Sequence, residues 1–263
     1  MIFTVPESEI AIDLTLPDAR FDAPELFLPR RKPVGNVVID RTNFYGKRLK
    51  HAYIFTDDLL GKDLAGNRDG VIVGNTITQS GNNLLSTGDN NNHRLNLESV
   101  SESDFMSGRS DLTALSKVFY QDLGGRTAPR IFDKSNSGGG VGGYQFGAWE
   151  NNNQWAFDID NVYNLSVPHT FGADRIYEVG ITIETDTEAH LNVRGIGTDT
   201  AAISGTYPVT TTTNAAIANW NHTTDRNWTG EIFYVYFFEG LLTDAQMEEV
   251  WNNPYQFLIP ANE

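Results

Sequence analysis

Three acidic residues in the segment ITIETDTEAH, residues 181–190, are placed where a β-strand would align them. Glu184, Asp186 and Glu188 occupy every second position, and alternate residues of a strand project from the same face. Two carboxyl groups about 5 Å apart can act as nucleophile and general acid in retaining glycoside hydrolysis. The spacing therefore raises the hypothesis of a glycanase in which the third acid orients the other two.

The residues between the acids favour a different structure. Thr185 and Thr187 would have to take core positions if the strand continued through the acids, and Thr-Asp-Thr between two apolar runs is typical of a hairpin turn. Apolar residues alternate on both sides of this turn, at Tyr177, Val179, Ile181, Ile183, Leu191 and Val193. We therefore predict a hairpin and assign no catalytic residue, with a glycoside hydrolase using Glu184 and Glu188 as an alternative.

A second candidate is a carbohydrate-binding surface made of tryptophans near asparagine-rich turns. Flat aromatic rings suit the apolar face of a pyranose, and amide groups suit its hydroxyls. The residues that would form this surface are Trp149, Asn151, Trp155, Trp220 and Trp228. The alternative is that these tryptophans pack the core and the asparagines only turn the chain.

The sequence gives little support for a metal site or for a catalytic histidine. In TDDLLGKDLAGNRDG, residues 56–70, the third position counted from Asp63 is Ala65 and the sixth is Arg68, so the EF-hand spacing fails. Turn-forming Asp and Asn explain this segment, and the four histidines at 93, 169, 190 and 222 are isolated. We predict no cofactor and no metal motif; calcium held by ligands from distant loops stays open.

Composition narrows the class of protein. Acidic residues outnumber basic ones 34 to 19, for a net charge of −15, which disfavours nucleic acids and anionic membranes as partners. The chain has 24 glycines, no cysteine and only 20% charged residues, a profile typical of many short strands joined by turns. We predict an all-β protein with no secretion signal and no membrane-spanning segment.

The first 35 residues differ from the rest of the chain. Five prolines stand among apolar residues, and the segment ends in the basic PRRKP. We predict two parts: an extended arm, residues 1–35, which docks on a partner or a neighbouring subunit, and a single domain, residues 36–263. The residues expected to dock are Phe21, Leu26, Phe27, Leu28, Arg30 and Arg31.

From residue 36 onward, short apolar runs alternate with Gly, Asn, Asp and Ser clusters, as in a β-sandwich. The run EIFYVYFF, residues 231–238, is apolar on both faces and predicts a central strand that is covered on both sides. One short C-terminal helix is expected, with Thr243 as its N-cap, Gln246 completing a capping box, and Pro254 as its stop. Its apolar face would be Met247, Val250 and Trp251, and the chain would then tuck Tyr255, Phe257, Leu258 and Ile259 against the sandwich.

Three segments resemble LamG-like domains of the concanavalin A-like lectin-glucanase superfamily. They are KHAYIFTDDLLGKDLAGNRDGVIVG at residues 50–74, RIFDKSNSGGGVGGYQFGAWENNNQWAFDID at 130–160, and WTGEIFYVYFFEGLLTDAQMEEVWNNPYQFLIP at 228–260. The PRRKPVG lead-in and the NPYQFLIP ending are most similar to the versions that tailed-bacteriophage virion proteins carry. The resemblance implies a jelly-roll β-sandwich of two antiparallel sheets, with any ligand site on the concave face or the loops at one edge.

This resemblance also implies a role. Domains of this type serve as accessory virion proteins or tail adhesins, so we expect a non-enzymatic decoration or fibre protein in the virion, assembled in the host cytoplasm. Its partners would be a phage capsid or tail protein and a host-surface polysaccharide, with homo-oligomers left open. A stand-alone lectin module is the main alternative.

Overall fold

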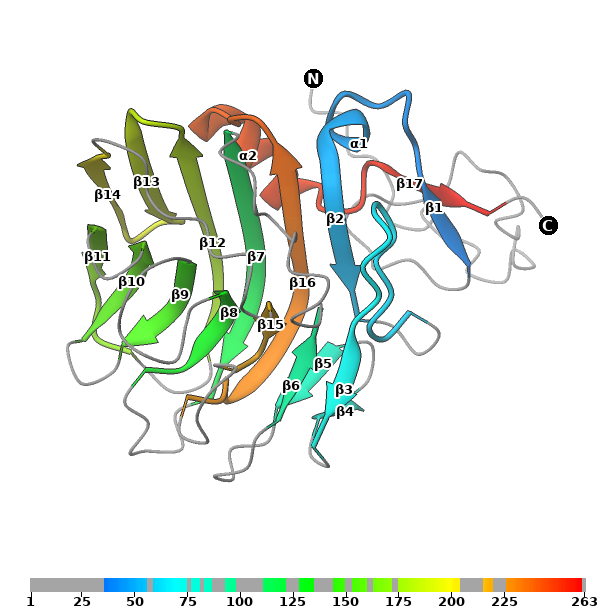
Figure 1. Cartoon of the computed structure of the whole chain (residues 1–263), viewed down its shortest axis with the longest axis horizontal. Coiled ribbons are helices and arrows are strands. Elements are labelled where there is room, and N and C mark those ends of the chain that lie inside the picture. Colours follow the sequence, from blue (N-terminus) through cyan, green and yellow to red (C-terminus); the bar gives the residue numbers. More distant parts are fainter. Residues whose placement is uncertain are drawn as a thin grey trace, which may run out of the picture.

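A computed structural model shows the chain as a β-sandwich (Figure 1). It describes residues 36–55, 59–74, 77–80, 83–86, 93–97, 111–121, 128–134, 144–149, 153–159, 163–171, 175–203, 215–219 and 226–261, apart from the side chains of residues 77–80, 83–86, 149 and 163. The predicted arm, residues 1–35, lies outside these ranges. Within them, no helix has the length and apolar character needed to cross a membrane.

Two antiparallel sheets form the layers. The eight-stranded sheet has the order β14 (Gly197–Ala202), β13 (Glu188–Val193), β12 (Arg175–Glu184), β7 (Leu112–Tyr120), β16 (Gly230–Glu239), β5 (Asn83–Ser86) and β4 (Ile77–Ser80), and β2 (Leu49–Ile54) pairs with β16. The seven-stranded sheet has the order β11 (Tyr163–Pro168), β10 (Gln154–Ile159), β9 (Tyr144–Trp149), β8 (Arg130–Lys134), β15 (Ala216–Ile217), β6 (Arg94–Asn96) and β3 (Val71–Val73). This is the jelly-roll sandwich that the sequence predicts.

The core lies between the two sheets because alternate side chains of each strand face inward. On β10 these are Trp155, Phe157 and Ile159, and on β12 they include Val179 and Ile181. All five are at most 3% exposed. Burying apolar surface at about 25 cal/mol per Å² is what stabilises this arrangement.

Strand β16 is apolar on both faces, as predicted. Val235 and Phe237 join the core between the sheets, whereas Tyr234, Tyr236 and Phe238 point away from it into a second apolar cluster. The second cluster covers the outer face of the eight-stranded sheet. It is closed by the C-terminal segment, which carries α2 (Asp244–Asn252) and returns past β16 (Figure 1).

Helix α2 has the predicted structure. The Thr243 side chain accepts a hydrogen bond from the Gln246 backbone, the Gln246 side chain accepts one from the Thr243 backbone, and Met247, Val250 and Trp251 are buried. A Cβ on Gly180 of β12 would lie 2.9 Å from Met247 Sδ and 3.1 Å from Trp251. Glycine at this position therefore lets the helix approach the sheet closely.

The ends of the described chain meet in a two-stranded ribbon. β1 (Val37–Ile39) pairs with β17 (Leu258–Pro260). Tyr255, Phe257 and Leu258 are buried as predicted, but Ile259 is 43% exposed because it pairs with the equally exposed Val38 on the open face of the ribbon. The prediction that Ile259 packs on the sandwich is therefore wrong.

The structure contains a second helix that the sequence did not predict. A five-residue helix, α1 (Phe44–Arg48), begins at Asn43, whose side chain accepts hydrogen bonds from the backbones of Tyr45 and Gly46. Five residues are too few to show a helical period in the sequence.

Candidate functional site

A row of polar side chains crosses the outer face of the seven-stranded sheet. Asp133 of β8 pairs with Gln145 of β9, Gln145 with Asp158 of β10, and Asp158 with Asn164 of β11. Directly paired residues of antiparallel strands project from the same face. Their neighbours Phe132, Phe146, Phe157 and Leu165 face the core, so these four polar residues face away from it.

A β-bulge brings a cation to the same face. The pairing between β8 and β9 shifts register between Arg130 and Phe132, and both Ile131 and Phe132 turn into the core. The extra residue places Arg130 and Asp133 on one face although they are three positions apart. Arg130 Nε lies 3.6 Å from Asp133 Oδ2.

Hydrogen bonds hold these groups in a fixed order. Arg130 Nη2 donates to Gln145 Oε1, and Gln145 Nε2 donates to Asp158 Oδ2 at 2.9 Å. The four side chains are 1% (Arg130), 0% (Asp133), 8% (Gln145) and 3% (Asp158) exposed. The orientation of the Gln145 amide therefore follows from its two charged neighbours.

The row continues across β15 to β6. Ala216 pairs with Asp133 on one side and with Asn96 on the other, and Arg94 Nε donates to Asn96 Oδ1 at 2.6 Å. Burial lowers the pKa of Arg94. We name Asn96, Asp133, Gln145, Asp158 and Asn164, with Arg130 beside them, the polar row.

The two ends of the polar row are accessible, in contrast to its centre. Asn164 is exposed and Asn96 is partly exposed. Five interstrand steps separate them, or about 24 Å at the usual strand spacing. The row combines rigid central groups with accessible amides at both ends, and it is long enough to follow an extended polar ligand.

Two of the predicted sugar-stacking tryptophans are not on the surface. Trp155 and Trp228 are both 0% exposed and stack on each other with ring centroids 6.1 Å apart. Trp155 also packs edge-on against Tyr177 and Phe171. The prediction that these two rings bind sugar is wrong, because alternation along β10 points Trp155 into the core.

The side chains of the other three residues of that prediction lie outside the described part of the chain, so their role stays a prediction. Trp149 is the last residue of β9 and pairs with Gln154, but its side chain lies outside the described part of the chain. Asn151 and Trp220 also lie outside it, as do the six arm residues Phe21, Leu26, Phe27, Leu28, Arg30 and Arg31.

The alternating acids form a hairpin, as the threonines between them indicated. Glu184 ends β12 and pairs with Glu188 at the start of β13, while Asp186 sits in the turn with φ +56°. Thr187 N donates to Glu184 O, closing the turn at 3.1 Å. The Thr185 amide donates to Asp111 Oδ1 at 3.0 Å. A single strand presenting three acids on one face is therefore not formed.

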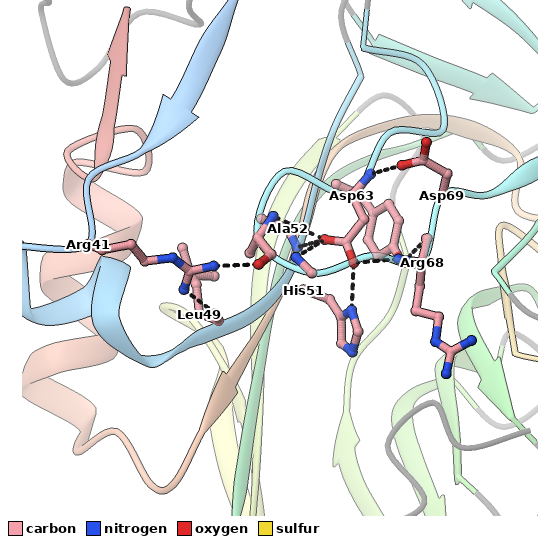
Figure 2. A network of polar contacts seen from close by, with 10 residues as sticks. Arg41, Leu49, His51, Ala52, Asp63, Arg68 and Asp69 are labelled. Carbon is pink, nitrogen blue, oxygen red and sulfur yellow. Dashed lines mark hydrogen bonds and ion pairs between the residues drawn. The ribbon is translucent and has the colours of Figure 1, made fainter. Parts of the chain in front are cut away.

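The calcium candidate is a structural carboxylate (Figure 2). Asp63 Oδ1 accepts hydrogen bonds from the backbones of Ala52 at 2.9 Å and Gly66 at 3.0 Å, and Oδ2 lies 2.6 Å from His51 Nδ1. The Ala65 and Arg68 amides also donate to it. Donors around both oxygens satisfy an anion and leave no coordination positions for a cation.

Electrostatics agree with this role. Burial opposes the ionisation of Asp63, but the hydrogen bond from His51 and the backbone amides outweigh it and lower the pKa of this carboxyl. A Cβ on Gly66 would lie 2.5 Å from Asp63 Oδ2 and 2.7 Å from His51 Nδ1. The glycine in DLAGN is thus required by the close approach of the loop to Asp63.

The polar row was not predicted from the sequence. Its central members lie in the short strands RIFDK, YQFGAW and QWAFDI, where polar and apolar residues are mixed. The signal was alternation, which places Gln145 and Asp158 opposite the apolar face. That Asp133 lines up with them depends on the bulge and the pairing register, which the sequence does not specify.

No model of a known protein family matches the sequence, and no curated protein matches it. Among solved structures, Trypanosoma rangeli sialidase in complex with sialic acid is similar with a TM-score of 0.60 and 12% identity, over 80% of this chain and 34% of that one. Another structure of Trypanosoma rangeli sialidase has a TM-score of 0.58 at 12% identity, over 80% of this chain and 33% of that one.

A smaller protein is similar over less of the chain. It is the Ruminococcus gnavus IT-sialidase CBM40 bound to alpha2,3 sialyllactose, with a TM-score of 0.45 and 14% identity, over 55% of this chain and 84% of that one. The chain spans about a third of the length of the trypanosomal sialidase. At 12% identity, the likeness to the trypanosomal sialidase shows the β-sandwich fold alone.

Proposed function

We propose that this protein is a carbohydrate-binding module that holds an oligosaccharide along the polar row. The observation that supports this most is the placement of Arg130, Asp133, Gln145 and Asp158 on an outer sheet face. Burying charged and amide groups costs free energy even when they are paired. The outer face of the other sheet shows that this fold can cover such a face with apolar residues instead.

The chemistry of the row suits sugar hydroxyls. The accessible amides at its ends offer both donors and acceptors at fixed positions, which is how sugar-binding and other small-molecule sites obtain orientation and specificity. In this proposal Asn96 and Asn164 contact the ligand, and the buried central groups position the strands that carry them. A row about 24 Å long fits a chain of sugar units better than one.

The fold likeness supports the choice of ligand class only indirectly. Trypanosoma rangeli sialidase was determined in complex with sialic acid, so sialic acid belongs among the ligands to be tested. We propose binding without hydrolysis, since Glu184 and Glu188 lie in the eight-stranded sheet and the polar row lies in the other.

We also propose a narrower setting, a decoration or fibre protein of a phage virion. It is supported by the LamG-like segments. It is also supported by the pairing of β1, which follows the PRRKPVG lead-in, with β17, which lies in the NPYQFLIP ending. The arm residues from Phe21 to Arg31 would dock on a capsid or tail protein, and the sandwich would face host-surface polysaccharide.

Retention on immobilised polysaccharides tests the main proposal. The pure protein is passed over a panel of bacterial, algal and sialylated glycans, with and without calcium, and new reducing ends are measured in the same samples. We expect retention without new reducing ends, and loss of retention in Asn164→Ala and Gln145→Ala. Thr200→Ala, on the outer face of the other sheet, is the matched control and should bind normally.

Two results would contradict the proposal. Unchanged retention in both variants would move the site away from the polar row, and new reducing ends abolished by Glu184→Gln would make the protein a hydrolase. The virion setting has its own test: replacing Phe21, Leu26, Phe27 and Leu28 with serine should release the protein from particles while its glycan retention is unchanged.

A further inference from the structure

The seven-stranded sheet ends in a short, exposed apolar strand. β3 stands at the end of the sheet and, among the described strands, pairs only with β6. Its sequence is Val-Ile-Val, with Val71 66% and Ile72 40% exposed. Edge strands are normally protected by short length, charges, proline or a bulge; β3 is short, at three residues, but it carries neither a charge nor a proline.

Ile72 shows that the sandwich is open at this margin. It pairs with Leu95, which is fully buried in the core, so Ile72 lies on the inner side of the sheet. An isoleucine on the inner side of a sandwich is normally buried. The β14 edge of the eight-stranded sheet provides a contrast, since its exposed residues are Thr198, Thr200 and the small Ala202 and include no large apolar side chain.

The arm contains a segment with the pattern of a matching strand. Between Pro6 and Pro17, the apolar residues Ile10, Ile12, Leu14 and Leu16 alternate with Ala11, Asp13 and Thr15. One face of such a strand is apolar and the other small or polar. That is the pattern required beside β3, where one side faces the core margin and the other faces solvent.

We propose that residues 9–16 add to the β3 edge of the same chain as a further strand of the seven-stranded sheet. The edge of β3 would supply backbone hydrogen bonds, and the four apolar residues would cover Ile72. The residues from 17 to 35 can span about 60 Å when extended, which is ample for pairing within one chain. Tethering also gives an effective concentration in the millimolar range, which favours the chain's own arm over a second copy.

This proposal is independent of the proposed sugar site. It also leaves the predicted docking residues, Phe21 to Arg31, in the connecting segment, where they stay available to a partner.

Cysteine cross-linking of the full chain tests the proposal, because the protein has no cysteine of its own. Val71→Cys is combined in turn with Ala11→Cys, Asp13→Cys and Thr15→Cys, which covers neighbouring pairing registers. We expect a cross-linked monomer for at least one pair in dilute solution. The same three partners with Thr200→Cys on β14 are the matched control and should not cross-link.

Hydrogen exchange of the β3 amides gives a second readout on the full chain. Ile12→Asp combined with Leu14→Asp should make residues 71–73 exchange several-fold faster, whereas Ala11→Asp combined with Thr15→Asp, on the other face of the segment, should not. Covalent dimers in place of cross-linked monomers would overturn pairing within one chain. Cross-linking no stronger than at β14, with unchanged exchange, would overturn the strand addition.

Discussion

The outer faces of the two sheets carry buried side chains of opposite kinds, apolar on the eight-stranded sheet and polar on the seven-stranded sheet. Strand β16 of the eight-stranded sheet turns Tyr234, Tyr236 and Phe238 outward, and the C-terminal segment covers them with Tyr255 and Phe257. Met247, Val250 and Trp251 of α2 belong to the same apolar cluster. Strands β8, β9 and β10 of the seven-stranded sheet turn charged and amide groups outward, which pair with one another.

This difference indicates different roles for the two outer faces, stability for the apolar face and ligand recognition for the polar face. Apolar cover contributes free energy in proportion to the area it buries, so the outer face of the eight-stranded sheet strengthens the fold. A buried polar network contributes little net stability, since desolvation offsets most of the attraction. A network that is retained without stabilising the fold is better explained by the position that it gives to the strands carrying Asn96 and Asn164, the groups proposed to contact the ligand.

The largest effect is expected on the apolar outer face. Replacing Trp251 with alanine removes a 2%-exposed ring that packs beside Gly180, and should lower the free energy of unfolding by about 4 kcal/mol. Urea unfolding measures it, and glycan retention of the folded fraction should be unchanged. A loss below 1 kcal/mol would mean that the C-terminal segment packs only loosely on the sheet. The two outer faces would then not differ in their contribution to stability.

A slightly smaller effect is expected at the loop that Asp63 organises. Asp63→Ala leaves the amides of Ala52, Gly66 and Arg68 without their acceptor, at a cost of about 3 kcal/mol. Because the pKa of Asp63 is lowered on folding from 3.8, its ionised form stabilises the protein above about pH 4.

The direction in which this loss of stability changes with pH can also be predicted. As the pH falls through the lowered pKa, the wild-type protein loses the contribution of the ionised Asp63, so the difference between wild type and Asp63→Ala should shrink. Urea unfolding of both proteins at pH 7 and pH 3 checks it. An equal difference at both values would show that the charge of Asp63 does not matter.

Part of this molecule follows from local sequence. The apolar run of β16, the capping box at Thr243 and the Thr-Asp-Thr turn each carry their own signal within a few residues, and all three are present. Strand β15 has only two residues, so it offers no periodic pattern, and its place is set by pairing with β6 and β8. Strand β11, YNLSVP, does alternate apolar and polar residues, but it ends in proline.

The candidate site was harder to predict for the same reason. Trp155 beside an asparagine-rich turn is compatible with either a sugar platform or a core residue, and only its inward position on β10 decides between them. The alignment of Asp133, Gln145 and Asp158 requires the register of three strands and a bulge at Arg130. These are tertiary facts that no single segment encodes.

A gain of stability is expected at Tyr236. Its hydroxyl is buried without a hydrogen-bond partner among the described residues, its ring stacks on Tyr234 at 4.4 Å, and burial raises its pKa well above 10.0. Tyr236→Phe removes the unpaired group and should stabilise the fold by about 1 kcal/mol. The urea midpoint should rise with the slope unchanged; a fall would reveal an ordered partner, such as a buried water.

The smallest change in stability should accompany the largest change in function. Replacing Arg130, Asp133, Gln145 and Asp158 together with Met, Leu, Leu and Leu converts the polar face into one like its counterpart. Since well-packed apolar residues replace buried ion pairs at little or no cost, the free energy of unfolding should change by no more than about 1 kcal/mol, while glycan retention is lost. The control is Thr182→Leu with His190→Leu, a cross-strand pair on the outer face of the other sheet, which should retain glycans. Strong destabilisation by the fourfold replacement would show that the polar row mainly stabilises the fold. The two outer faces would then differ in composition but would both contribute to stability.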